Sequence, residues 1–301
     1  MDKLQTIQIF IEVANLKKFS AAADKLGLSA PVVTRSIAEL EGRLGARLIN
    51  RTTRHVRLTE AGTRFLQDAQ RIVEDLEDAE AAVKGIYTKP SGTLSVTAPV
   101  LFGEKHVMPI VTEYLEHNPE VSVKTMFYDR ITSLVEEEFD VAIRIGHLKD
   151  SGLYAIQVGE VRRIVCGSPI YFEKYGTPSV PADLANHSIV YPVSAGNIIN
   201  QWSFSTNGKK EVVKLYPRLR CNQIGSALKA AILGHGITSL LSYQVAEHIE
   251  NGQLQNILTN YEEAPLPVNV VHLEGRRVNA KTRSFIDLAA KRLRTNPFIN
   301  S

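Results

Sequence analysis

The sequence predicts an all-α N-terminal domain, a long connecting helix and a larger α/β C-terminal domain. Apolar residues recur at helical spacing through the first 44 residues and then follow a seven-residue repeat to about residue 86. From Gly92 onward, short apolar strands alternate with helical segments. At roughly 100–200 residues per domain, a chain of 301 residues is long enough for this division.

The composition is that of an ordinary globular protein, with 44% hydrophobic and 22% charged residues, which argues against disorder. No apolar run reaches the ~18 residues that a membrane-spanning helix needs, and the N-terminus lacks the features of a signal peptide. We therefore expect no membrane partner and a cytoplasmic location. Cys166 and Cys221 are too few for a disulfide framework. Buried thiols are the main interpretation, and a redox role is the alternative.

Three short helices are predicted before residue 46. The second runs from Ala21 to Leu26, with Ser20 as its cap and Gly27 at its end. The third begins after Ser29 and ends at Gly45, so a turn of about three residues separates the two, as in a helix-turn-helix. The first helix has an apolar side made of Leu4, Ile7, Phe10, Ile11 and Ala14.

The third helix and the segment after it have the character of a DNA-binding surface. The outer side of the helix start is placed to meet base edges and phosphates. Residues 47–58 read as a short hairpin, or wing, with arginines available to the DNA backbone and minor groove. The alternatives are a solvated arginine-rich face and a helical packing module without a ligand. The outward residues of the helix are Ala30, Val32, Thr34 and Arg35.

A long helix is predicted from Thr59 to about Tyr87, about 40 Å at 1.5 Å per residue. One apolar stripe on so long a helix needs a partner, and a second copy of the helix is the simplest one. Packing against the C-terminal domain of the same chain is the alternative. The stripe comprises Phe65, Ala69, Ile72, Leu76, Ala79, Val83 and Ile86.

The C-terminal part reads as a β-α-β succession, which predicts a mostly parallel sheet covered by helices. A second group of strands follows the first, and the chain then returns to finish with a strand and a helix. Strands are predicted at residues 93–98, 121–128, 140–146, 164–166, 188–191, 218–222, 236–240 and 268–273, and helices at 107–115, 131–138, 225–233 and 281–293.

Residues 19–62, FSAAADKLGLSAPVVTRSIAELEGRLGARLINRTTRHVRLTEAG, resemble the winged helix-turn-helix of LysR-type transcriptional regulators. Ala30 and Thr34 stand where many members have glutamine and serine. Ala30 lacks the bidentate contact of glutamine to adenine and suits a thymine methyl instead. The resemblance implies a recognition helix with Ser29, Pro31, Thr34 and Arg35, and a wing with Arg51, Thr52 and Arg54.

The segments GTLSVTAP, DVAIRIG, VCGSPIYFEKYG, PADLANHSIVY and GHGITSLL are similar to the two-lobed, periplasmic-binding-protein-like effector domain of the same family. The resemblance implies a DNA-binding domain at residues 1–58, an antiparallel dimerisation helix at 59–88 and an effector domain at 92–301. Lobe I would comprise about 92–160 and 267–301, and lobe II about 161–266.

Ligands of such folds lie between the lobes, where strand ends meet helix N-termini. One arginine beside an otherwise apolar loop predicts a small, partly hydrophobic organic anion as effector. An ion pair with Asp140 is the alternative role for Arg144, and a place in the core is the alternative for Phe102 and Trp202. The candidate contacts are Thr97, Ala98, Pro99, Val100, Leu101, Phe102, Arg144, Gly146, Trp202, Asn222 and Ile224.

We expect no enzymatic activity, because the chain has no phosphate-binding GxxxxGK[ST] loop, no GxSxG elbow and no HExxH pair. The eight histidines lack metal-ligand spacing, so neither a metal nor a cofactor is expected. The predicted function is transcriptional regulation through double-stranded promoter DNA and a small-molecule effector. Self-association as a dimer, or as a tetramer built from two dimers, is expected, with RNA polymerase as a candidate partner. The alternative is an architectural DNA-binding protein whose ligand-free C-terminal domain serves oligomerisation.

Overall fold

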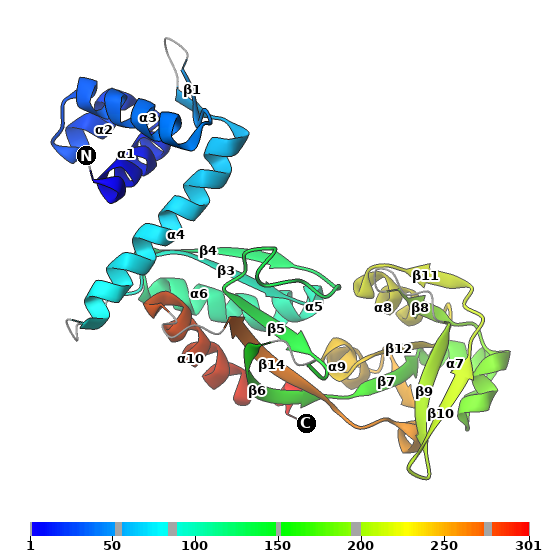
Figure 1. Cartoon of the computed structure of the whole chain (residues 1–301). Coiled ribbons are helices and arrows are strands. Elements are labelled where there is room, and N and C mark those ends of the chain that lie inside the picture. Colours follow the sequence, from blue (N-terminus) through cyan, green and yellow to red (C-terminus); the bar gives the residue numbers. More distant parts are fainter. Residues whose placement is uncertain are drawn as a thin grey trace. The chain divides into compact units, whose positions relative to one another are not determined.

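The computed structural model describes residues 2–51, 56–83, 89–148, 152–193, 200–273 and 279–300. These residues form two compact units, Met1–Thr88 and Lys89–Ser301 (Figure 1). In the described residues, no helix combines the length and apolar character needed to cross a membrane.

The first unit contains three short helices, a two-stranded hairpin and a long helix (Figure 1). Phe10, Val33, Ile37 and Leu40 are buried between the short helices, as their helical spacing predicts. The elements are α1 (Lys3–Leu16), α2 (Phe19–Leu26), α3 (Ala30–Leu44), β1 (Ile49–Arg51), β2 (Val56–Leu58) and α4 (Glu60–Val83).

The predicted start of the second helix is wrong, whereas both ends of the third are confirmed. Helix α2 begins at Phe19, and its N-cap is Lys18, not Ser20. Lys18 has extended backbone, and Phe19 packs against the helical core, so the first turn starts earlier than a serine cap suggests. Helix α3 follows Ser29, whose side chain makes no capping hydrogen bond, and ends at Gly45 with φ of 66°.

A five-stranded sheet organises the first lobe of the second unit, which we define by this sheet and the helices α5, α6 and α10. The strand order is β4-β3-β5-β14-β6, and only β14 runs against the other four. Helices α6 and α10 pack against each other and against the sheet. The bounds are β3 (Gly92–Ala98), α5 (Val100–Phe102), a π-helical turn (Gly103–Val107), α6 (Met108–His117), β4 (Val121–Phe127), β5 (Val141–Ile145), β6 (Leu153–Val161), β14 (Leu266–Leu273), α10 (Ala280–Arg294) and a 3-10 turn (Pro297–Ile299).

The second lobe comprises the elements from β7 to the 3-10 turn at Thr259–Tyr261. Its central sheet, β12-β7-β13, is antiparallel, so the mostly parallel prediction is wrong here. Along the chain, β6 leads directly into β7, and β12 is followed by α9. Strand β13 leads through the 3-10 turn at Thr259–Tyr261 to β14 in the first lobe. The bounds are β7 (Arg163–Gly167), α7 (Pro169–Tyr175), a 3-10 turn (Pro181–Asn186), β8 (Val190–Pro192), β9 (Gln201–Thr206), β10 (Lys209–Lys214), β11 (Leu219–Cys221), α8 (Ile224–Ile232), β12 (Thr238–Leu241), α9 (Ser242–Glu250) and β13 (Gln255–Ile257).

The segment predicted as a helix at residues 131–138 forms turns instead. The carboxylate of Glu137 accepts hydrogen bonds from the backbone N–H of Ser133 (3.1 Å) and from the guanidinium of Arg130 (2.8 Å). Leu134 and Phe139 are buried beneath these turns. Local side-chain hydrogen bonds of this kind compete with the helical backbone pattern.

Candidate DNA-binding surface and ligand sites

Helix α3 divides into a buried side and an outer face at its N-terminal end. Val33 and Ile37 are fully buried in the core of the first unit. Thr34 is half-buried. The outer face consists of the exposed residues Ser29, Ala30, Pro31, Val32 and Arg35.

The β1–β2 hairpin is tied to the end of α3 by Glu41, which is not among the residues predicted from the sequence. The Glu41 carboxylate accepts hydrogen bonds from the backbone N–H groups of Leu48 (2.8 Å) and Ile49 (3.0 Å). Arg57, on β2, is exposed. The candidates Thr52 and Arg54 lie outside the described residues, as does the side chain of Arg51.

The hairpin is also tied to the start of α4, so that three elements meet at one junction. The Thr59 hydroxyl donates to the carbonyl oxygen of Arg47 (2.7 Å) and accepts from the backbone N–H of Gly62 (2.9 Å), which confirms Thr59 as a helix cap. A Cβ at position 62 would lie 1.9 Å from the carbonyl oxygen of Leu48. Only glycine permits this approach of α4 to the hairpin.

The apolar stripe on α4 is partly buried against its own unit and partly exposed. The ring of Phe65 lies 5.3 Å from that of Phe10 in α1, and Ala69 is fully buried within the same unit. Ile72 and Leu76 are 48% and 38% exposed. The side chains of the candidates Ala79 and Val83 lie outside the described residues. The first part of the stripe therefore anchors α4 to its own unit, whereas Ile72 and Leu76 are open to solvent.

In the first lobe, a carboxylate of the chain itself occupies a position predicted for a ligand anion. The backbone N–H of Val100, at the start of α5, donates to Oδ1 of Asp129 (3.0 Å). Burial raises the pKa of Asp129, whose Oδ2 has no hydrogen-bond partner among the described residues. Pro99, Val100 and Leu101 are half-buried, while Thr97, Ala98 and Phe102 belong to the buried strand end and core.

Arg144 lies near the end of β5 and makes a different contact from the ion pair considered for it. Its guanidinium donates to the carbonyl oxygen of Thr132 (2.6 Å), and Asp140 accepts from the backbone N–H of Ser95 (2.7 Å). Desolvation lowers the pKa of Arg144. Gly146 follows with φ of 112°, a backbone conformation that favours glycine.

The candidates of the second lobe fall into separate places. Asn222 is exposed, and Ile224 packs against the apolar cluster around Leu228. Trp202 is 7% exposed and belongs to a different cluster with Phe204 and Leu215. Trp202 is thus a core residue on one side, but it also borders a pocket.

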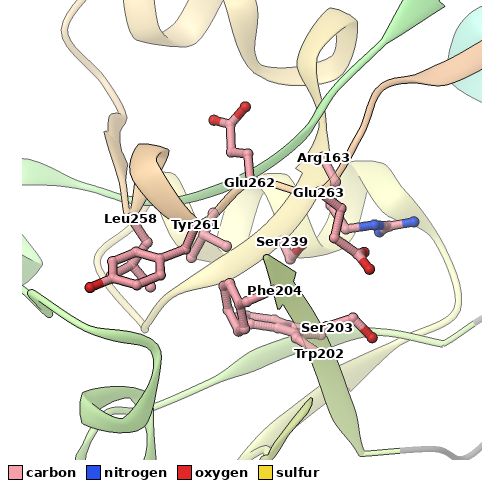
Figure 2. A pocket seen from close by; sticks show the side chains of 10 residues that line it. Arg163, Trp202, Ser203, Phe204, Ser239, Leu258, Tyr261, Glu262 and Glu263 are labelled. Atoms are coloured by element: carbon pink, nitrogen blue, oxygen red, sulfur yellow. The ribbon is translucent and has the colours of Figure 1, made fainter. Parts of the chain in front are cut away.

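The alternation of side chains along β7 creates this pocket, which we call the Trp202 pocket. Arg163 and Val165 share one face of β7, and Ser239 of β12 lies directly opposite Val165. The cavity is small, about 10 Å³, which is room for about one water molecule (Figure 2). Its walls are completed by Trp202, Ser203, Phe204, Leu258, Tyr261, Glu262 and Glu263.

The polar groups of the Trp202 pocket are incompletely paired. Arg163 is exposed; desolvation lowers the pKa of its guanidinium, and the nearby charge of Glu263 acts in the opposite direction. The Ser239 hydroxyl is buried without a partner among those residues. Glu262 forms an ion pair with Arg162 (2.9 Å) through one oxygen, and its other oxygen is buried and unpartnered in the described part of the chain.

The two thiols are differently placed. Cys166 is buried on the opposite face of β7 from Val165, and burial raises the pKa of its thiol to about 12. Cys221 is half-buried. The Cys166 thiol is therefore protonated at neutral pH and is a poor nucleophile.

Comparison with known proteins gives two matching family models. Residues 4–63 match the bacterial regulatory helix-turn-helix proteins of the lysR family, and residues 88–294 match the LysR substrate-binding domain. An HTH-type transcriptional regulator of Xanthomonas campestris pv. campestris is 33% identical over 288 residues, which cover 95% of this chain and 84% of the relative. The regulator CrgA of Neisseria meningitidis is 30% identical, with 97% of each chain covered.

Two solved structures resemble the whole chain. The structure of CrgA, described as a LysR-type transcriptional regulator, has a TM-score of 0.62 and 28% identity, covering 97% of this chain and 99% of the other. The full-length structure of the Vibrio cholerae virulence activator AphB has a TM-score of 0.61 and 25% identity, covering 96% and 99%.

Proposed function

Because the chain belongs to the LysR family of bacterial transcriptional regulators, we propose that it binds promoter DNA in the cytoplasm as a homo-oligomer. The observation that carries this proposal is the exposed outer face of α3, set above a fully buried side. In this assignment the outer face and Thr34 meet the bases of the major groove. Arg51, Thr52 and Arg54 hold the phosphate backbone.

Two classes of substitution test these roles. Thr34→Ala changes which operator sequences are preferred, because it removes a group placed for base contact. Arg54→Ala weakens binding on all sequences and lowers the salt slope by about one charge, because it removes a phosphate contact. Footprints and salt titrations on a set of DNA sites measure both effects. If the two variants behave alike, the assignment of base and phosphate roles is wrong.

For the second unit, the proposed ligand is a small organic anion held near Arg144 between the lobes. Support comes from the cationic side chain at the end of β5, where desolvation disfavours an uncompensated charge. Since Asp129 already accepts the N–H of Val100, the anion has to meet Arg144 rather than that amide. Titration calorimetry of the full chain with small carboxylates, repeated on Arg144→Met, tests this. The proposal is contradicted if no carboxylate gives a heat signal in the titration while neutral ligands bind tightly.

Coupling between ligand and DNA separates this proposal from the architectural alternative. A regulator whose two sites are coupled by typically ~1–3 kcal/mol changes its DNA occupancy when the ligand is added. Footprints on the DNA upstream of this protein's own gene, with and without carboxylates, make the comparison. An unchanged footprint in the presence of a ligand that binds favours a purely architectural role.

A further inference from the structure

We propose that Arg162, Ser242 and Glu262 form a clamp that restrains rotation of one lobe against the other. We call these three residues the hinge clamp. The chain passes between the lobes at two places: Arg162 is the single residue between β6 and β7, and residues 262–265 lead from the second lobe to β14 (Figure 1). A change in the angle between the lobes therefore has to bend both connections.

The two connections carry complementary charges. Arg162 and Arg163 are consecutive on the first, and Glu262 and Glu263 are consecutive on the second. The guanidinium of Arg162 donates to Oε2 of Glu262 (2.9 Å). Desolvation lowers the pKa of Arg163, and the charge of Glu263 opposes this effect, so the second two charges also attract each other. Two successive attractions hold the connections together, where an isolated surface pair would contribute little.

Ser242, the first residue of α9, lies at the same place. Its backbone N–H donates to the carbonyl oxygen of Arg162 (2.8 Å), and its hydroxyl accepts from the backbone N–H of Arg162 (3.1 Å). The next residue, Tyr243, is buried in the core of the first lobe, with its ring 5.1 Å from that of Phe102. Val245 packs in a cluster of the second lobe. The clamp therefore holds α9 where it contacts both lobes.

Burial makes the ion pair difficult to open. The side chain of Glu262 is 13% exposed, whereas that of Arg162 is 41% exposed. Oε1 of Glu262 is buried and accepts no hydrogen bond from the described residues, so Arg162 is the cation that compensates this carboxylate. A buried carboxylate that loses its cation is strongly unfavourable, whereas an exposed guanidinium that loses its anion is hydrated. This difference restrains the hinge and predicts unequal effects of the two substitutions.

Hydrogen–deuterium exchange of the full-length protein, without ligand or DNA, tests the clamp. Because the N–H groups of Arg162 and Ser242 belong to it, peptides covering residues 158–166 and 238–246 report its opening. We expect Arg162→Met to accelerate exchange in these hinge peptides at least tenfold, and Glu262→Gln to accelerate it by a smaller factor. Peptides of β3 and β4, inside the first lobe, should exchange as in the unmodified protein, which distinguishes an open hinge from general unfolding.

A double variant and a matched control complete the test. Combining Arg162→Met with Glu262→Gln removes the uncompensated carboxylate, so exchange should be slower than in Arg162→Met alone. Arg130→Met is the control, because Arg130 is 42% exposed and pairs with Glu137 within the first lobe. The proposal is overturned if the single variants leave the hinge peptides unchanged, if their effects add in the double variant, or if Arg130→Met accelerates exchange there equally. Neither DNA nor an effector enters the measurement, so its result is independent of the proposed function.

Discussion

Glycine is required at one residue position of the first unit and is dispensable at another nearby. Gly62→Ala places a methyl group against the carbonyl of Leu48, and we expect it to lower the free energy of unfolding by about 2–3 kcal/mol. Gly42, inside α3, has open space around its Cα, so Gly42→Ala should raise the free energy of unfolding by about 0.5–1 kcal/mol. Denaturant unfolding of the two variants measures both changes, and equal effects would refute the role of the close approach.

Glu41 is a positioning residue for the hairpin. Glu41→Ala leaves the backbone N–H groups of Leu48 and Ile49, both 2% exposed residues, without their acceptor. The expected loss is about 2 kcal/mol of stability, together with weaker DNA binding. Glu41→Gln keeps one acceptor oxygen and should lose less, and the exposed Glu39→Ala is the control. Unfolding and gel-shift measurements that rank all three variants equally would contradict this role.

Among the helices and strands, α4 is the element that we expect to mediate self-association. Ile72 and Leu76 form the open part of its apolar stripe, so Ile72→Glu should weaken self-association at least tenfold by placing a charge in the helix pair. Arg71→Ala, on the neighbouring exposed position, is the control. Sedimentation velocity over a concentration series distinguishes the variants. A dimer that persists unchanged in Ile72→Glu shows that the contact lies elsewhere.

Helices could be predicted from the sequence where the apolar repeat and the residues that end a helix agree. Helix α3 combines an apolar repeat with Gly45, and both features survive in the structure. The sequence also contains a signal for the β9–β10 hairpin, which the predicted strands do not include. Asn207 and Gly208 both have positive φ, 51° and 74°, as in the two-residue turns favoured by Asn-Gly. Sequence alone did not reveal the turns at residues 131–138, because the hydrogen bonds of Glu137 decide them.

The sites were less predictable than the elements, because they join distant parts of the chain. Asp129 reaches Val100 only because β4 pairs with β3. The Trp202 pocket combines residues of β7, β9, β12 and the segment before β14, which are up to 100 positions apart, from Arg163 to Glu263. No local pattern specifies such a combination. The outer face of α3 could be predicted because all its residues lie on one helix.

For the whole molecule, the lowered pKa of His106 predicts that the free energy of unfolding depends on pH. Burial, and then the charge of Lys105, lowers the pKa of His106 from 6.5 to about 4. Between these two values the unfolded chain binds more protons, so the free energy of unfolding rises with pH. The contribution of His106 is complete above pH 6.5 and is lost as the pH falls towards 4, a change of about 3 kcal/mol.

Substitution of His106 isolates this contribution. His106→Gln should flatten the difference in unfolding free energy between pH 7 and pH 5, whereas the exposed His117→Gln should leave it as in the unmodified protein. The raised pKa of Asp129 acts in the opposite direction, but it is present in all three proteins and cancels in the comparison. An unchanged pH profile in His106→Gln would contradict the argument.

The junction of Glu41, Thr59 and Gly62 has a mechanical consequence. Because hydrogen bonds and one close backbone approach fix the start of α4 to both the hairpin and α3, these parts turn together. Helix α4 then acts as a lever with α3, the helix proposed to face DNA, at its short end. A tilt applied at the far end of the lever rotates α3 by the same angle without deforming it.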